Sequence, residues 1–287
     1  MDLYEYDRQD PRLGRNVEHD ERSLAFAVGV LPRSAIKTVH WGRRIDILDQ
    51  GTLGSCTGNA GTGLLGTDST ARQGLVKVDI TAAAAAASQG TFTAGSYPLN
   101  EDFAVRLYSL ATRLDEFSGS YPPDDTGSSG LGVAKALKAL GLATSYQHAF
   151  SLDAMNAALQ TAPVMIGIVW MNSMFEPDSE GLIPVDRSSG IAGGHELVVN
   201  GLDVDTGTYT LTNSWSTSWG VDGIGYLKSD DLKWLLSQDG DVTVPTWALV
   251  TPDPGPDPGP DPGPGTAVDD AQLWEVAKQW AAGKGLS

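Results

Sequence analysis

The 287-residue sequence contains a single cysteine, Cys56, and few basic residues. One cysteine cannot form an internal disulfide, so we expect a fold that is stable without covalent cross-links. Lysine and arginine together number 19, against 36 aspartate and glutamate residues, which gives a formal net charge of −17. This charge repels phosphate backbones and anionic lipids. We therefore expect neither a nucleic-acid partner nor a membrane partner.

Long apolar segments are also missing. No run approaches the roughly 18 apolar residues that a membrane-spanning helix needs. The first 15 residues, MDLYEYDRQDPRLGR, lack the basic and then apolar pattern of a signal peptide. We expect the chain to be made in the cytoplasm, which leaves open a later release or association with a virus particle.

Composition divides the chain into four segments. Residues 1–40 are polar without a clear period, and we expect them to wrap the surface of the folded domain. Residues 41–250 hold most of the apolar residues and predict that domain. Residues 252–265 read PDPGPDPGPDPGPG, which is typical of an extended spacer. Residues 266–287 predict a short amphipathic helix that docks on its own domain, docks on a partner protein or stays disordered.

Within the domain, helical patterns precede strand patterns. Helices are predicted over 56–65, 101–117 and 133–140, with Ser55 as the cap of the first and Gly141 ending the third. The small, polar stretch 66–98 between the first two predicts a long loop. Strands are predicted over 164–170, 196–202, 209–213 and 223–228. This order indicates an α+β domain with two segregated lobes.

Cys56 lies where a nucleophile is expected. It follows a glycine-rich turn at the predicted start of a helix, where the helix dipole favours a thiolate. A thiol also needs a base. His195 follows two glycines and opens an apolar strand, so its imidazole has room to accept the proton. Asn213 ends the next strand, where its amide oxygen can hold the imidazole in one tautomer. For His19, His40 and His148 we expect solvated or structural roles.

These residues carry a resemblance to a known family. The segment Gln50-Gly-Thr-Leu-Gly-Ser-Cys56 resembles the active-site segment of the papain-like (C1-type) cysteine peptidases, in a bacterial or phage-type member. Gly194-His195 resembles the family's histidine strand, and Asn213-Ser-Trp215-Ser-Thr-Ser-Trp219-Gly220 resembles its asparagine segment. The order of cysteine, histidine and asparagine is also the same.

The resemblance implies a papain-like two-lobe fold, with the nucleophile helix in a helical first lobe and an antiparallel, barrel-like sheet in the second. It implies that the Gln50 side chain and the Cys56 backbone N–H form the oxyanion hole. Trp215 would shield the hydrogen bond between His195 and Asn213. The substrate backbone would bind in extended form at Gly127, Ser128 and Gly194. No metal and no cofactor is implied.

The sequence departs from the family pattern at three positions. Leu53 stands where a cysteine is usual, and Thr57 replaces a usual aromatic residue. Glu196 follows His195 where alanine is common. Its carboxylate either faces the imidazole or enters the second lobe, where it needs a buried partner.

The function that the resemblance implies is a cysteine endopeptidase acting on peptide or protein substrates. Cys56 would form a thioester acyl-enzyme, with His195 as general base and acid. Two alternatives stay open from the sequence. One is a lysis-type enzyme that uses the same triad on peptidoglycan peptides, and the other is a catalytically silent binding module.

Overall fold

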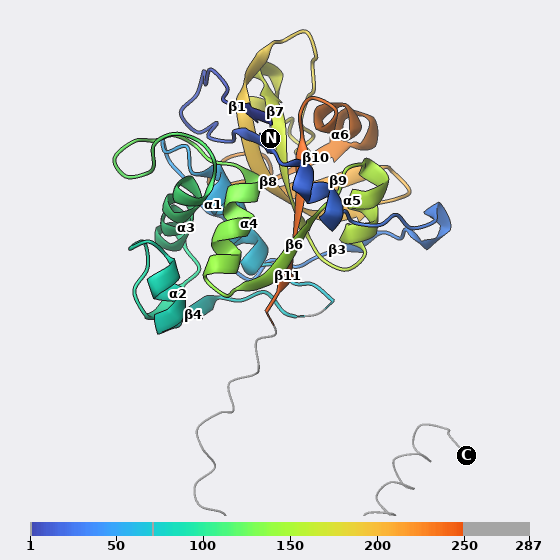
Figure 1. Ribbon diagram of the computed structural model, residues 1–287. Helices are drawn as coiled ribbons and strands as arrows, with labels where there is room; N and C mark the ends of the chain where they lie inside the picture. Colours follow the sequence, from blue (N-terminus) through green and yellow to red (C-terminus); the bar gives the residue numbers. More distant parts are fainter. Residues whose placement is uncertain (1, 71, 249–287) are drawn as a thin grey trace, which may run out of the picture. The chain divides into compact units, whose positions relative to one another are not determined.

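The computed structural model describes residues 2–70 and 72–248, which form helices and a large antiparallel sheet (Figure 1). The predicted spacer (252–265) and the predicted C-terminal helix (266–287) lie outside the described residues. Among residues 2–70 and 72–248, no helix has both the length and the apolar character needed to cross a membrane.

Three helices from the first half of the chain pack against one another. They are α1 (Cys56–Leu65), α3 (Glu101–Leu114) and α4 (Gly130–Ala139). The side chain of Asn100 accepts a hydrogen bond from the backbone N–H of Phe103 and caps α3. A Cβ at Gly58 of α1 would lie 2.7 Å from Tyr108 Cβ, so α1 and α3 approach this closely only because position 58 is glycine.

The second half of the chain supplies most of a sheet that has seven strands in the described residues. The strand order is β10, β9, β8, β7, β11 and β6, and β3 pairs with the C-terminal end of β8. The strands are β3 (Val39–His40), β6 (Ala143–His148), β7 (Val164–Met171), β8 (Ile191–Asp203), β9 (Thr208–Thr212), β10 (Ile224–Lys228) and β11 (Asp241–Trp247). Helices α5 (Leu152–Leu159) and α6 (Ser229–Leu236) pack against this sheet.

The hydrophobic core consists of two clusters, one for each lobe. The first surrounds the sheet together with α5 and α6, and the second lies among α1, α3 and α4. Figure 1 shows these three helices beside the sheet. The α+β architecture with a helical part and an antiparallel second part is the one predicted from the order of helix and strand patterns.

Several local predictions are wrong. The stretch 66–98 is not a long loop, because it contains the hairpin of β4 (Lys77–Ile80) and β5 (Gly95–Pro98) and the helix α2 (Ala82–Ala87). Its alanines favour a helix, and the Thr81 side chain caps that helix by accepting from the Ala84 N–H.

The predicted helix caps also need correction. Ser55 stands before α1 but makes no capping hydrogen bond through its side chain. Helix α4 begins three residues before the predicted start, because the Ser129 side chain accepts from the Gly132 N–H and caps an earlier turn. Gly141 follows α4 with φ +70°, as expected for a glycine that ends a helix.

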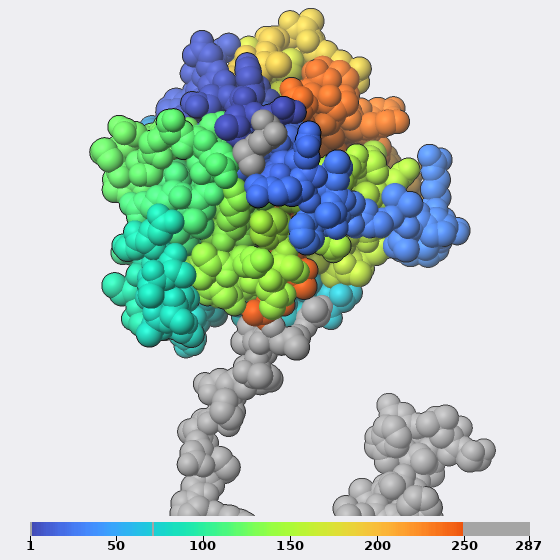
Figure 2. All heavy atoms as spheres, in the orientation of Figure 1, coloured from blue at the N-terminus to red at the C-terminus, as the bar shows by residue number. Residues whose placement is uncertain are grey.

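The N-terminal residues run between the two lobes. Strand β1 (Asp2–Tyr4) pairs with β2 (Val17–His19), and residues 13–18 are buried, so this part is not the surface extension expected for 1–40. In Figure 2 the N-terminal atoms, in blue, lie between the green residues of the helical part and the orange residues around α6. The 3-10 turns Glu21–Phe26 and Arg33–Ala35 follow without buried residues.

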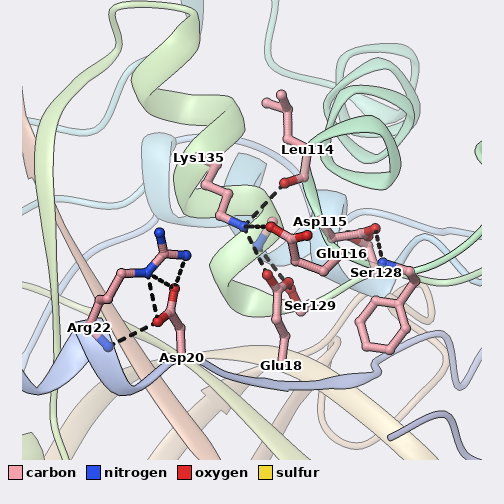
Figure 3. Close-up of polar contacts among 11 residues, drawn as sticks. Glu18, Asp20, Arg22, Leu114, Asp115, Glu116, Ser128, Ser129 and Lys135 are labelled. Atoms are coloured by element: carbon pink, nitrogen blue, oxygen red, sulfur yellow. Dashed lines mark hydrogen bonds and ion pairs between the residues drawn. The ribbon is translucent and has the colours of Figure 1, made fainter. Parts of the chain in front are cut away.

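Strand β2 is held against the helical lobe by an ion pair. Figure 3 shows Glu18 between Ser129 and Lys135. The Ser129 hydroxyl donates to Glu18, and the Lys135 ammonium lies 2.8 Å from Glu18 Oε1. Ser128 also donates from its hydroxyl to Asp115, at 2.7 Å. These contacts fix β2 against the start of α4.

Candidate active site

Cys56 begins α1 at the base of the cleft and is fully buried. The turn before it is held by Asp125, which accepts from the Gly54 N–H at 2.9 Å and from the Tyr108 hydroxyl at 2.6 Å. Burial raises the pKa of the Cys56 thiol to about 12, while the backbone N–H groups of Glu196 and Gly14 lower it. The thiol in this form is therefore protonated at neutral pH.

His195 lies on β8 and is also fully buried. Its Nε2 lies 2.7 Å from Asn213 Oδ1, which also accepts from the Ser214 N–H at 2.8 Å. An oxygen that accepts from the ring requires the proton on Nε2, and Nδ1 is then the acceptor. Nδ1 has no hydrogen-bond partner among residues 2–70 and 72–248.

The His195 ring is surrounded by aromatic side chains. Its centroid lies 4.7 Å from that of Trp215 and 4.9 Å from that of Trp170. Burial lowers the pKa of His195 to about 4, although the hydrogen bond to Asn213 raises it. Trp215 is itself buried, so water is kept from the side of the ring that it covers.

Gln50 is oriented by two donors from the segment that follows β9. Its Oε1 accepts from the Ser214 hydroxyl at 2.8 Å and from Trp215 Nε1 at 3.2 Å. The Nε2 group must therefore point the other way, and it donates to the carbonyl oxygens of Leu53 at 2.7 Å and Arg12 at 3.0 Å. Gln50 thus already donates to a peptide carbonyl that belongs to the N-terminal segment.

The predicted backbone-binding residues contact the same segment. Ser128 accepts from the Asn16 N–H at 2.7 Å and donates its own N–H to Gly14 at 2.9 Å. Gly194 accepts from the Arg15 N–H at 3.1 Å. A Cβ at Gly127 would collide with the Gly14 oxygen, which explains why glycine stands there. Residues 12–16 therefore cross the site as a covering segment, with single bridges from Gly14 to Gly194 and from Arg15 to Ser128.

The structure gathers the eight predicted site residues around residues 12–16. These are Gln50, Cys56, Gly127, Ser128, Gly194, His195, Asn213 and Trp215. The covering segment was missed, because its polar sequence has no period that marks a strand. Glu196 points away from the imidazole, into the second lobe, where Arg15 and Asp241 face it. No group of three metal-ligating side chains comes together within residues 2–70 and 72–248.

This arrangement of lobes and cleft is found in a solved cysteine protease. The structure matches xylellain, a cysteine protease from Xylella fastidiosa, with a TM-score of 0.56 over 85% of this chain and 99% of that chain. The chain has a papain-like fold. Sequence identity over this match is 17%, and no family model and no curated protein matches the sequence.

Two other structures with the papain-like fold match less well. Bromelain from Ananas comosus, in complex with the E64 inhibitor, has 14% identity and a TM-score of 0.43 over 76% of this chain and 100% of that chain. Digestive procathepsin L2 from the larval midgut of Tenebrio molitor has 13% identity and a TM-score of 0.47 over 82% and 78%.

Proposed function

We propose that the protein is a cysteine endopeptidase whose nucleophile is Cys56. The observation that carries this proposal is the peptide segment lying across the site, with one carbonyl bound by Gln50 Nε2 at 3.0 Å. The same backbone groups of Ser128 and Gly194 are available to bind a substrate in extended form. The hydrogen bond between His195 and Asn213 orients the proposed base, and the backbone N–H of the next residue, Glu196, acts on the Cys56 thiol.

The proposed reaction has two stages. His195 Nδ1 accepts the thiol proton as the sulfur attacks a peptide carbonyl, and the oxyanion is stabilised by Gln50 Nε2 and the Cys56 N–H. The C–N bond breaks, the amine leaves with the proton from His195, and a thioester remains on Cys56. Water, deprotonated by His195, then hydrolyses the thioester and regenerates the thiol.

The described form is closed, since residues 12–16 occupy the cleft. The leaving amine takes its proton from His195, so it lies on the side of the site where Trp215 packs against the imidazole. Residues 12–16 begin on that side, because the Arg12 guanidinium lies 4.2 Å from the Trp215 ring centroid. The residues before the cut bond then lie at Ser128. A substrate runs from Ser128 toward Trp215, whereas residues 12–16 run the opposite way. The segment therefore covers the nucleophile without the orientation of a substrate.

The test of this function uses the full chain and its Arg15→Ala variant, in which the covering segment has lost a buried side chain. Each protein is incubated with the epoxide E-64, which alkylates cysteine nucleophiles, and with a mixed peptide library. We expect labelling of Cys56 and cleavage of the library, with both lost in His195→Ala. An unlabelled Cys56 in Arg15→Ala would overturn the proposal. Labelling without library cleavage would overturn peptidase action on ordinary peptides and direct the search to peptidoglycan peptides.

Replacing Gln50 should slow the reaction without preventing nucleophile labelling. Loss of one oxyanion-hole donor typically lowers kcat by about 10²–10³-fold, so we expect that loss for Gln50→Ala. The measurement is kcat for a fluorogenic peptide, with Gln160→Ala as the control glutamine outside the cleft. A kcat that falls less than threefold in Gln50→Ala would show that Gln50 binds only the covering segment.

A further inference from the structure

A closed acidic pocket lies beside the backbone-binding residues and holds the side chain of Arg15. Arg15 has no exposed surface. Its Nη2 lies 2.6 Å from Asp241 Oδ2 and 2.5 Å from the Asp239 carbonyl oxygen, and its Nη1 lies 3.3 Å from the Tyr6 hydroxyl. Its Nε also donates to Asp241, at 3.2 Å. The pocket therefore recognises a guanidinium group through directed contacts.

Glu196 forms a second acidic wall. It is fully buried, and neither of its carboxylate oxygens has a hydrogen-bond partner within residues 2–70 and 72–248. Asp241 Oδ1 likewise lacks one there. Burial raises the pKa of Glu196 well above its ordinary value, the charge of Asp241 raises it further, and the charge of Arg15 lowers it. A buried carboxyl group without partners is costly unless the site receives a cation or donor.

Two glycines give the pocket its space. A Cβ at Gly167 would lie 2.6 Å from Arg15 Nε and 2.7 Å from Glu196 Oε2. A Cβ at Gly130 would lie 2.6 Å from Asp241 Oδ1 and 2.9 Å from Glu196 Oε1. Any larger residue at either position would fill the space between the two acids. The pocket is thus formed by four separate elements: α4, β7, β8 and β11.

We propose that this pocket selects arginine, and less strongly lysine, in the substrate. The inference rests on the peptidase function proposed above and names its substrate class. Gly14 packs against Gly54, two residues before Cys56, so closely that a Cβ at position 14 would collide with the Gly54 oxygen. Arg15 is the next residue, so the pocket receives the side chain adjacent to the residue over the nucleophile turn. Because the residues before the cut bond lie at Ser128, that side chain belongs to the second residue before the cut. Arg15 occupies the pocket in the closed form as a substrate side chain would.

The first experiment changes only the substrate. Full-length Arg15→Ala, whose pocket is free of its own arginine, is assayed with four peptides that differ at the second residue before the cut. That residue is arginine, lysine, the neutral isostere citrulline or leucine. We expect kcat/KM to fall about 30-fold or more from arginine to citrulline, because the two acids lose their cation. Equal rates for the four peptides would overturn the pocket assignment and leave the peptidase function standing.

The second experiment changes the pocket. Glu196→Gln and Asp241→Asn are made in the Arg15→Ala background, first singly and then together as a double variant of the pocket. We expect the ratio of arginine to leucine kcat/KM to fall at least tenfold in the double variant. Asp205→Asn is the matched control, since Asp205 is exposed in the turn between β8 and β9 and lies outside the pocket. An unchanged ratio in the double variant overturns the proposal. If no peptide is cut by any variant while Cys56 stays unlabelled, the proposed function itself is wrong.

Discussion

Replacing Cys56 with alanine should abolish peptide hydrolysis, and replacing His195 with alanine should reduce it by about 10⁴-fold. Without the sulfur no thioester forms. Without the imidazole, no base accepts the thiol proton as the sulfur attacks the carbonyl. The measurement is kcat/KM with a fluorogenic peptide in the Arg15→Ala background, where substrate can enter the cleft.

The control for this pair is an exposed histidine on the same sheet. His40 lies on β3, which pairs with the far end of β8 from His195. His40→Ala should keep the activity of its parent. A His195→Ala variant that retains more than a tenth of the parent activity would contradict the proposed base, even if Cys56→Ala is inactive.

The sequence was informative about the site because its residues stand next to strong local signals. Cys56 begins α1 after a glycine-rich turn, His195 opens the apolar run of β8, and Asn213 directly follows β9. Each of these elements pairs or packs through a continuous buried face, so its type could be read from composition alone. The chain order of the three segments then resembled one family.

The remaining features depend on contacts between residues far apart in the sequence. Strand β6 (Ala143–His148) was missed because it lies at the edge of the sheet and is largely polar. Strand β11 lies between β7 and β6, and it was missed because Pro245 interrupts its pattern. Arg15 and Asp241 are separated by 226 residues, and nothing local to either one marks a buried ion pair. The direction of Glu196 was open for the same reason. The charged groups nearest to it come from β11 and from the N-terminal segment.

Replacing Arg15 with alanine should open the cleft and raise peptide hydrolysis by the full chain. Removing one partner of a buried ion pair typically costs about 3–5 kcal/mol, which corresponds to about 10²- to 4 × 10³-fold in the balance between closed and open forms. The rate of peptide hydrolysis stops increasing once the open form predominates. The measurements are the initial rate with a fluorogenic peptide and the rate of E-64 labelling of Cys56.

The pH dependence of labelling should change in the same variant. In the closed form, burial raises the pKa of Cys56 to about 12 and lowers that of His195 to about 4, so between pH 5 and 9 both groups stay neutral. Labelling of the unmodified chain should therefore be slow throughout this range. Opening admits water, which lowers the thiol pKa and raises the imidazole pKa. Labelling of Arg15→Ala should then be fast at neutral pH, where His195 can take the thiol proton.

Arg22→Ala is the matched control for the opening of the cleft. Arg22 belongs to the same N-terminal region, but it is exposed and pairs with Asp20 at the surface (Figure 3). Its removal should leave the rate of peptide hydrolysis and the rate of E-64 labelling unchanged.

Because Glu18 still joins Lys135 in Arg15→Ala, the freed segment stays tethered beside the cleft and competes with substrate. Adding Glu18→Gln to Arg15→Ala should therefore raise the rate at low substrate more than at saturation. Equal labelling rates for Arg15→Ala and the unmodified chain would contradict this account, since they would mean that the Arg15 side chain does not hold the cleft closed.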